Sequence, residues 1–244
     1  MAEPAEDAEQ LLRQELDCPR EDGELYEARG EEVDDLRPVC QGDVYEGLTL
    51  PGYELGDHEM VMLSQHPCSL RSGAALRPRI QALPVRRHQY LPPRSWSGHG
   101  KVFPLPALED KEHLAADLSE AGMVTREQLA SARRTITLSR RAILLLQQRI
   151  VWTAAHTIVG LDTFEEFNAP ALEEIELLEG WNELLCGELE GAERAAALET
   201  TAQQFEAYIR EEGLQDALAQ TDRRSDARRT IRMEAIRRRE VRDT

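Results

Sequence analysis

The residues best suited to binding chemistry are the cations of one long segment. Between Met60 and Leu108 the chain has no aspartate or glutamate, although acidic residues outnumber basic ones 46 to 29 overall. Guanidinium groups bind phosphates, and they bind carboxylates in a two-point geometry. Aromatic rings can stack on unpaired bases. The basic segment carries these cations, with Tyr90, Trp96 and His99 among them: Arg71, Arg77, Arg79, Arg86, Arg87, Arg94 and Lys101.

The basic segment has two interpretations, and we keep both. In the first, its six arginines and Trp96 bind an acidic protein surface, either on a partner or on the chain's own acidic N-terminal arm. In the second, the same side chains bind nucleic acid. The net charge of −17 argues against the whole molecule coating nucleic acid or an anionic membrane, so we favour the acidic protein surface. A homo-oligomer and a hetero-complex are both compatible with this interpretation.

His58, His66 and Cys68 have the donor atoms of a nucleophilic or metal site. A thiolate beside an imidazole is the arrangement of cysteine nucleophiles. However, Pro67 separates His66 from Cys68 and favours a turn over a continuing strand. Structural zinc sites have a second closely spaced ligand pair, which is missing from this sequence. We therefore expect no metal, no cofactor and no catalytic residue here.

Short strands must position these side chains. Three segments, 43–47, 59–64 and 79–86, are rich in Val, Ile, Leu or Met and are separated by Gly and Pro. Such a pattern is typical of a small barrel or a curled sheet, which we assign to residues 38–108. Before it, residues 2–37 contain 14 acidic and 4 basic residues. This composition predicts an acidic, flexible arm over residues 1–37.

After residue 109 the sequence predicts a helical domain that extends to residue 220. One long helix is expected over 125–159, because Thr125 and Gln128 have the spacing of a capping box and Gly160 follows as a stop. Four residues recur along it with a period of seven: Leu129, Ile136, Ile143 and Ile150. The centre of this helix is apolar on several faces, so we expect four of its side chains to be buried: Ile143, Leu146, Ile150 and Trp152.

Two further helices are predicted at 170–190 and 191–212, each with apolar residues every three or four positions. Their outer faces are acidic, which indicates an acidic helical bundle. The last segment, 221–244, holds nine arginines and five acids and predicts a charged extension.

Residues 42–87 resemble the small barrels of the MazF/PemK toxin family. The resemblance rests on Gly42-Asp43-Val44-Tyr45 and on three later segments: Leu50-Pro51-Gly52, Val61-Met62-Leu63-Ser64 and Leu83-Pro84-Val85-Arg86. It implies an SH3-like barrel, and the toxins use theirs to cleave single-stranded RNA. Here His58-Glu59 stands where the family has Arg-Pro, and Arg86 stands at its catalytic Thr. Because transition-state charge needs a positioned donor, these exchanges remove the expectation of cleavage.

We therefore predict an α+β protein: an SH3-like barrel, a long central helix and an acidic helical bundle. The N-terminal residues lack the layout of a signal peptide and no apolar run is long enough for a membrane helix, so a cytoplasmic location is expected. The predicted role is non-catalytic binding or scaffolding. The alternative is a diverged toxin-like endoribonuclease or a nucleic-acid-binding protein that uses His58, His66 and Arg86.

Overall fold

The computed structural model describes residues 15–55, 59–108 and 112–242 of the 244-residue chain. These residues form two compact units, each assembled from several stretches of sequence. Among the described residues, unit 1 comprises 15–33, 40–55, 59–66, 78–108 and 112–167. Unit 2 comprises the described residues 34–39, 67–77 and 168–242.

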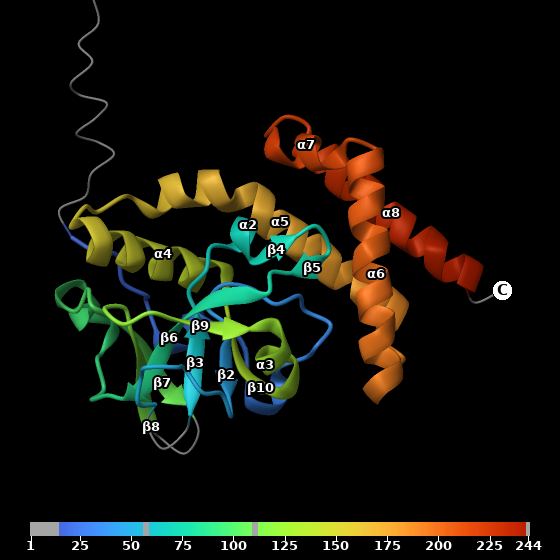
Figure 1. Cartoon of the computed structure of the whole chain (residues 1–244). Helices are drawn as coiled ribbons and strands as arrows, with labels where there is room; N and C mark the ends of the chain where they lie inside the picture. The colour runs from blue at the N-terminus through green and yellow to red at the C-terminus, as the bar shows by residue number, and fades with distance from the viewer. Residues whose placement is uncertain (1–14, 56–58, 109–111, 243–244) are drawn as a thin grey trace, which may run out of the picture. The chain divides into compact units, whose positions relative to one another are not determined.

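One curled antiparallel sheet is the framework of unit 1 (Figure 1). Its strands follow the order β1-β10-β2-β3-β6-β8-β7, and β9 also pairs with β6. Strand β6 has nine residues, which lets it pair with β3 along one edge and with both β8 and β9 along the other. The strands are β1 (Tyr26–Arg29), β2 (Val44–Glu46), β3 (Met60–Leu63), β6 (Arg79–Arg87), β7 (Val102–Leu108), β8 (Glu112–Asp117), β9 (Gly122–Thr125) and β10 (Arg133–Leu138).

The three strands predicted from the sequence are confirmed as β2, β3 and β6. All four residues of β3 are buried, because this strand lies in the middle of the sheet between β2 and β6. Turns and short helices connect the strands of unit 1: η1 (Asp22–Leu25), η2 (Gly30–Glu32), η3 (Pro93–Gly98) and α3 (Arg126–Ser131). The longer helix α4 (Arg140–Ala155) completes the unit.

The prediction of one long helix over 125–159 is wrong. That segment forms α3, then strand β10, then α4, and only the capping box is confirmed, since Thr125 Oγ1 accepts the Gln128 N–H at 3.2 Å. Residues 133–138 read Arg-Arg-Thr-Ile-Thr-Leu, and β-branched residues favour a strand once neighbouring strands are available. Here β10 lies between β1 and β2. Three strands of the sheet, β8, β9 and β10, lie after residue 109, where the sequence predicts a helical domain.

Helix α4 also ends earlier than predicted. His156 takes the left-handed conformation with φ of 54°, so the helix stops at Ala155 rather than at Gly160. The expected burial holds for Ile143 and Leu146, which are 1% and 0% exposed. Ile150 and Trp152, nearer the end of the helix, are only half-buried.

The predicted flexible arm at 1–37 is wrong for its described residues. Tyr26 pairs with Leu138, so β1 is an edge strand of the sheet. Leu25 is 0% exposed, and the Glu24 carbonyl accepts the Ser139 hydroxyl at 2.6 Å. Burial of Leu25 and the pairing of β1 with the edge of β10 hold this acidic segment in place.

Unit 2 is mainly helical. Helix α5 begins at Leu161, near the end of unit 1, and Pro170 lies inside it. The helix therefore starts nine residues before the predicted helix at 170–190. Helix α6 agrees with the predicted 191–212, and the arginine-rich end of the chain forms α8. The elements are α2 (Pro67–Leu70), β4 (Arg71–Ser72), β5 (Ala75–Leu76), α5 (Leu161–Cys186), α6 (Gly191–Glu211), α7 (Leu214–Ala219) and α8 (Arg224–Arg242).

Two aromatic rings are central to the core of unit 2. Trp181 of α5 and Phe205 of α6 meet edge to face, with centroids 5.4 Å apart. Ile231 of α8 is 1% exposed and belongs to the same cluster. One face of helix α8 therefore belongs to the core of unit 2, so the predicted charged extension is not solvated on all sides.

The α+β class is confirmed: a curled antiparallel sheet is followed by helices. Among the described residues, no helix combines the length and the apolar character that crossing a membrane requires.

Candidate functional site

The structure does not gather the six predicted arginines into one cluster. Arg71 and Arg77 belong to unit 2, whereas the other four belong to unit 1. Arg79 and Arg87 stand at opposite ends of β6 and are exposed, as is Arg94 in η3. Eight residues of an extended strand separate the two ends of β6 by about 26 Å. Any partner that contacts both must be large.

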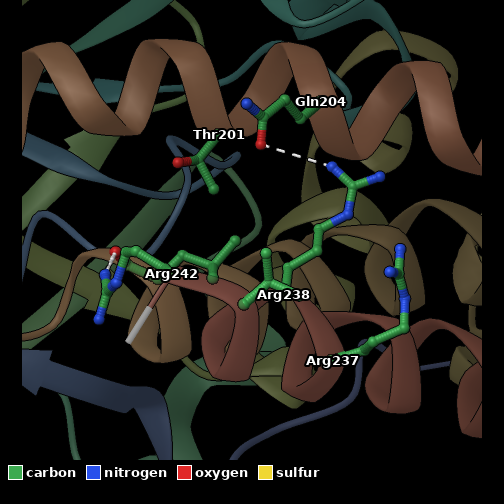
Figure 2. A pocket seen from close by; sticks show the side chains of 7 residues that line it. Thr201, Gln204, Arg237, Arg238 and Arg242 are labelled. Atoms are coloured by element: carbon green, nitrogen blue, oxygen red, sulfur yellow. Dashed lines mark hydrogen bonds between the residues drawn. The ribbon is translucent and has the colours of Figure 1, made fainter. Parts of the chain in front are cut away.

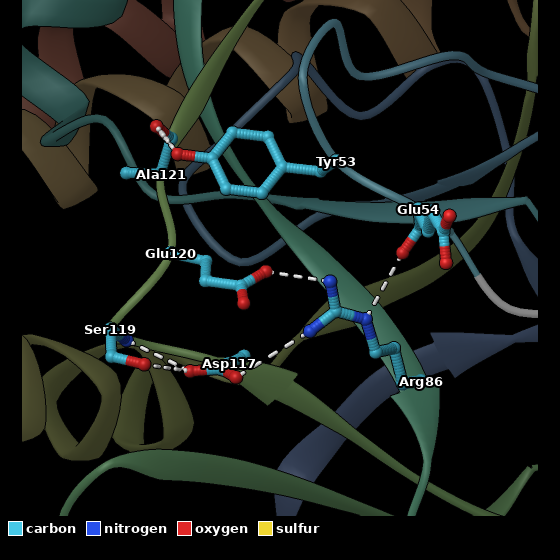
Figure 3. Close-up of polar contacts among 7 residues, drawn as sticks. All are labelled: Tyr53, Glu54, Arg86, Asp117, Ser119, Glu120 and Ala121. Carbon is cyan, nitrogen blue, oxygen red and sulfur yellow. Dashed lines mark hydrogen bonds and ion pairs between the residues drawn. The ribbon is translucent and has the colours of Figure 1, made fainter.

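Arg86 is the predicted site residue with the most clearly defined surroundings (Figure 3). Its Nη2 donates to Glu120 Oε2 at 2.6 Å, and its Nε donates to the Glu54 carbonyl at 3.1 Å. Its Nη1 lies 3.6 Å from Asp117 Oδ2. All three nitrogens of the guanidinium therefore face oxygen atoms of unit 1.

The fold brings these acids to Arg86 from outside the basic segment. Antiparallel pairing of β6 with β8 sets Arg86 opposite Ala115, and the chain then turns through Asp117 and Glu120. The turn is itself ordered, since Asp117 Oδ1 accepts the hydroxyl of Ser119 at 2.6 Å. Sequence reasoning missed both acids, and their only signal is that acidic residues resume as soon as the basic segment ends.

The electrostatics of this group favour a charged guanidinium with its partners in place. The hydrogen bond to Glu120 raises the pKa of Arg86, and the charges of Glu120, Asp117 and Glu54 act in the same direction. Arg86 and its two carboxylates are each about one-third exposed. An arginine compensated in this way has little remaining attraction for a phosphate.

Trp96 is not a stacking surface, because its side chain is 0% exposed. Its indole N–H donates to the Leu91 carbonyl at 3.1 Å, and its ring meets Phe103 edge to face at 5.5 Å. The guanidinium of Arg149 lies over the same ring at 5.1 Å. The indole is thus a core residue of unit 1.

Arg149 is a buried cation that sequence reasoning missed. Its Nη2 donates to the carbonyl of Asp17 at 2.9 Å, and its Nη1 donates to that of Leu145 at 3.2 Å. Burial lowers the pKa of Arg149 to about 10. Because the hydrogen bond to Asp17 ties α4 to the N-terminal segment, we assign Arg149 a structural role.

Of the histidines and the cysteine considered for catalysis or metal binding, the structure describes His66 and Cys68. His58 lies outside the described residues. His66 immediately precedes α2, and Cys68, inside α2, is exposed and free of disulfide bonds. Among the described residues, no group of three or more His, Cys, Asp or Glu side chains could hold a metal ion.

In comparisons with known proteins, no family model and no curated protein matches this chain.

Proposed function

We propose that this chain is a non-catalytic binding protein of a cytoplasmic assembly, and that a basic face of an SH3-like barrel takes an acidic protein partner. The observation that carries this proposal is the bonding of Arg86. Its guanidinium contacts two carboxylates and a carbonyl, so carboxylate is the anion that this arginine already binds within the chain. Arg79, Arg87 and Arg94 offer guanidinium groups at exposed positions of the same unit.

The arrangement of charges supports a protein partner over a reaction. Guanidinium groups match carboxylates in two-point geometry, and exposed cations steer an oppositely charged partner toward the surface. A ribonuclease, by contrast, needs a cation free to meet the charge that develops on the phosphate. The guanidinium of Arg86 is already bonded to Glu120, Asp117 and the Glu54 carbonyl, so it is not free in this way. The 165–216 segment, which includes most of α5 and all of α6, carries 15 acidic and 2 basic residues, so the same chain also supplies charge of opposite sign.

Nucleic-acid binding is the second candidate, and the ring pair of Tyr90 and His113 favours it. Tyr90 is 46% exposed, and its ring centroid lies 4.8 Å from that of His113. An exposed aromatic ring in an arginine-rich stretch of sequence could stack on an unpaired base. Against this, the Tyr90 hydroxyl donates to Asp22 at 3.1 Å, which places a carboxylate beside the ring.

The two candidates can be separated by binding measurements on the full chain. Fluorescence anisotropy would compare a glutamate-rich peptide with a single-stranded RNA of equal charge, at low and physiological salt. The test variant is Arg79→Gln/Arg87→Gln/Arg94→Gln. The control variant, Arg223→Gln/Arg229→Gln/Arg232→Gln, makes the same charge change at exposed positions of unit 2.

We expect the peptide to bind more tightly than the RNA, and the test variant to lose about tenfold in peptide affinity through lost charge-assisted hydrogen bonds. Equal losses in both triple variants would reject the barrel face. Cleavage of the RNA by the wild type, abolished by Arg86→Ala, would establish the endoribonuclease alternative instead.

A further inference from the structure

A cavity between helices α5, α6 and α8 of unit 2 is lined by three arginines and by no acidic side chain. Its volume is about 390 Å³, within the range of small-molecule sites. Arg237, Arg238 and Arg242 of α8 supply the charge (Figure 2). The remaining lining residues are Leu185, Thr201, Gln204 and Val241.

The structure holds Arg237 and Arg238 in fixed directions before any ligand arrives. Glu234 accepts two hydrogen bonds from Arg237, both at 2.7 Å, and one from Arg238 at 2.8 Å. Arg238 also donates to Gln204 at 3.5 Å and lies over the ring of Trp181 at 5.1 Å. These contacts reduce the side-chain entropy that binding would otherwise cost.

Both arginines keep donors for a ligand. Within the described part of the chain, Arg237 Nη1 and Arg238 Nη2 make no hydrogen bond. Arg242 closes another side of the cavity, where its Nη1 donates to the Leu185 carbonyl (Figure 2). One carboxylate, that of Glu234, serves the guanidinium groups of both Arg237 and Arg238, so these two arginines together carry one more positive charge than the carboxylate they share.

The other lining residues define what kind of anion fits. Leu185 and Val241 are apolar, whereas the Thr201 hydroxyl and the Gln204 amide are polar. Ligand sites commonly combine apolar walls with a few fixed polar groups in this way. A small organic anion would place its oxyanion against the arginines and its carbon skeleton against Leu185 and Val241.

We propose that this cavity is a binding site for a small organic molecule bearing a phosphate or several carboxylates. The site is independent of the proposed partner surface on unit 1. Phosphate and carboxylate share the oxyanion geometry that a guanidinium recognises, so the two ligand sources must be separated by experiment.

The test is isothermal titration calorimetry on the full chain with three probes: ADP, citrate and uncharged adenosine. Arg237→Gln removes a cation whose side chain is 64% exposed, so the variant should fold. Arg232→Gln is the control, because Arg232 is exposed on α8 and does not line the cavity. Circular dichroism would verify that both variants fold.

We expect ADP or citrate to bind and uncharged adenosine not to bind. Arg237→Gln should weaken the binding of the anion by about tenfold, the factor for one charge-assisted hydrogen bond. Arg232→Gln should change it by less than about twofold, since exposed charges separated from the ligand are screened by salt. Stronger binding of ADP would assign a phosphate ligand, and stronger binding of citrate a carboxylate. The proposal fails if neither anion binds, or if both variants weaken binding equally.

Discussion

Asp43, in the turn before β2, and Arg134, on the neighbouring strand β10, form an ion pair that is closed to solvent. Arg134 Nη1 lies 3.2 Å from Asp43 Oδ2, and the two side chains are 5% and 0% exposed. The same carboxylate oxygen accepts the Cys40 N–H at 2.9 Å. One carboxylate therefore shapes the turn and joins it to a strand about ninety residues away.

Removing the cation of this pair should be costly. Arg134→Ala leaves a buried carboxylate without its partner, so we expect the free energy of unfolding to fall by about 3–5 kcal/mol in urea denaturation. Arg133→Ala is the matched control, because Arg133 is 52% exposed and pairs with Glu31 at the surface. That variant should cost less than about 1 kcal/mol. Similar losses in both would contradict a special role for the buried pair.

Gly42 should tolerate a methyl group less well than Gly47. Both have positive φ, at 87° and 77°. A Cβ on Gly42 would lie 2.4 Å from Leu138 Cδ1, whereas one on Gly47 would meet nothing within 4 Å. Gly47→Ala should therefore cost only the backbone strain, about 1–2 kcal/mol. Gly42→Ala should cost roughly 1–3 kcal/mol more because of overpacking, and equal melting temperatures would refute the close approach.

The interior of α4 offers a third test. Leu146 is 0% exposed, so Leu146→Ala should lower the free energy of unfolding by about 2–5 kcal/mol through lost burial and a cavity. Ile150 is half-buried, and Ile150→Ala should cost less than about 2 kcal/mol. Chemical denaturation of the two variants measures the difference. A larger loss at Ile150 would show that the helix is rotated from the orientation described.

Glu234 should make the stability of unit 2 depend on pH. Hydrogen bonds from Arg237 and Arg238 lower the pKa of its carboxyl to about 2 from an ordinary 4.5. A depressed carboxyl pKa stabilises the fold above about pH 4.5, and this contribution is lost as the pH falls toward 2. Since Arg237 is 64% exposed, screening limits the effect to about 1 kcal/mol.

Glu234→Gln tests this dependence. The difference in unfolding free energy between wild type and variant should be largest near pH 7 and should shrink steadily below pH 4.5. A difference that stays constant down to pH 2.5 would show that the two arginines do not hold the carboxylate in its ionised form.

Local patterns in the sequence were sufficient for several elements. The strands β2, β3 and β6, the capping box at Thr125 and the bounds of α6 all follow from apolar spacing and turn residues within a few positions of each other. Such signals act over one or two turns of chain, so they are readable without knowing what packs against them.

What needed the tertiary structure was every feature that joins distant segments. Residues 133–138 become β10 only because β1 and β2 flank them, and the pairing of Tyr26 with Leu138 spans more than one hundred residues. The acid-free composition of 60–108 correctly marks a basic segment. Yet only the pairing of β6 with β8 brings Asp117 and Glu120 to Arg86, and only core packing buries Trp96. A residue's type determines which contacts it can make, whereas its partners depend on which strand edges and cavities the whole chain leaves open to it.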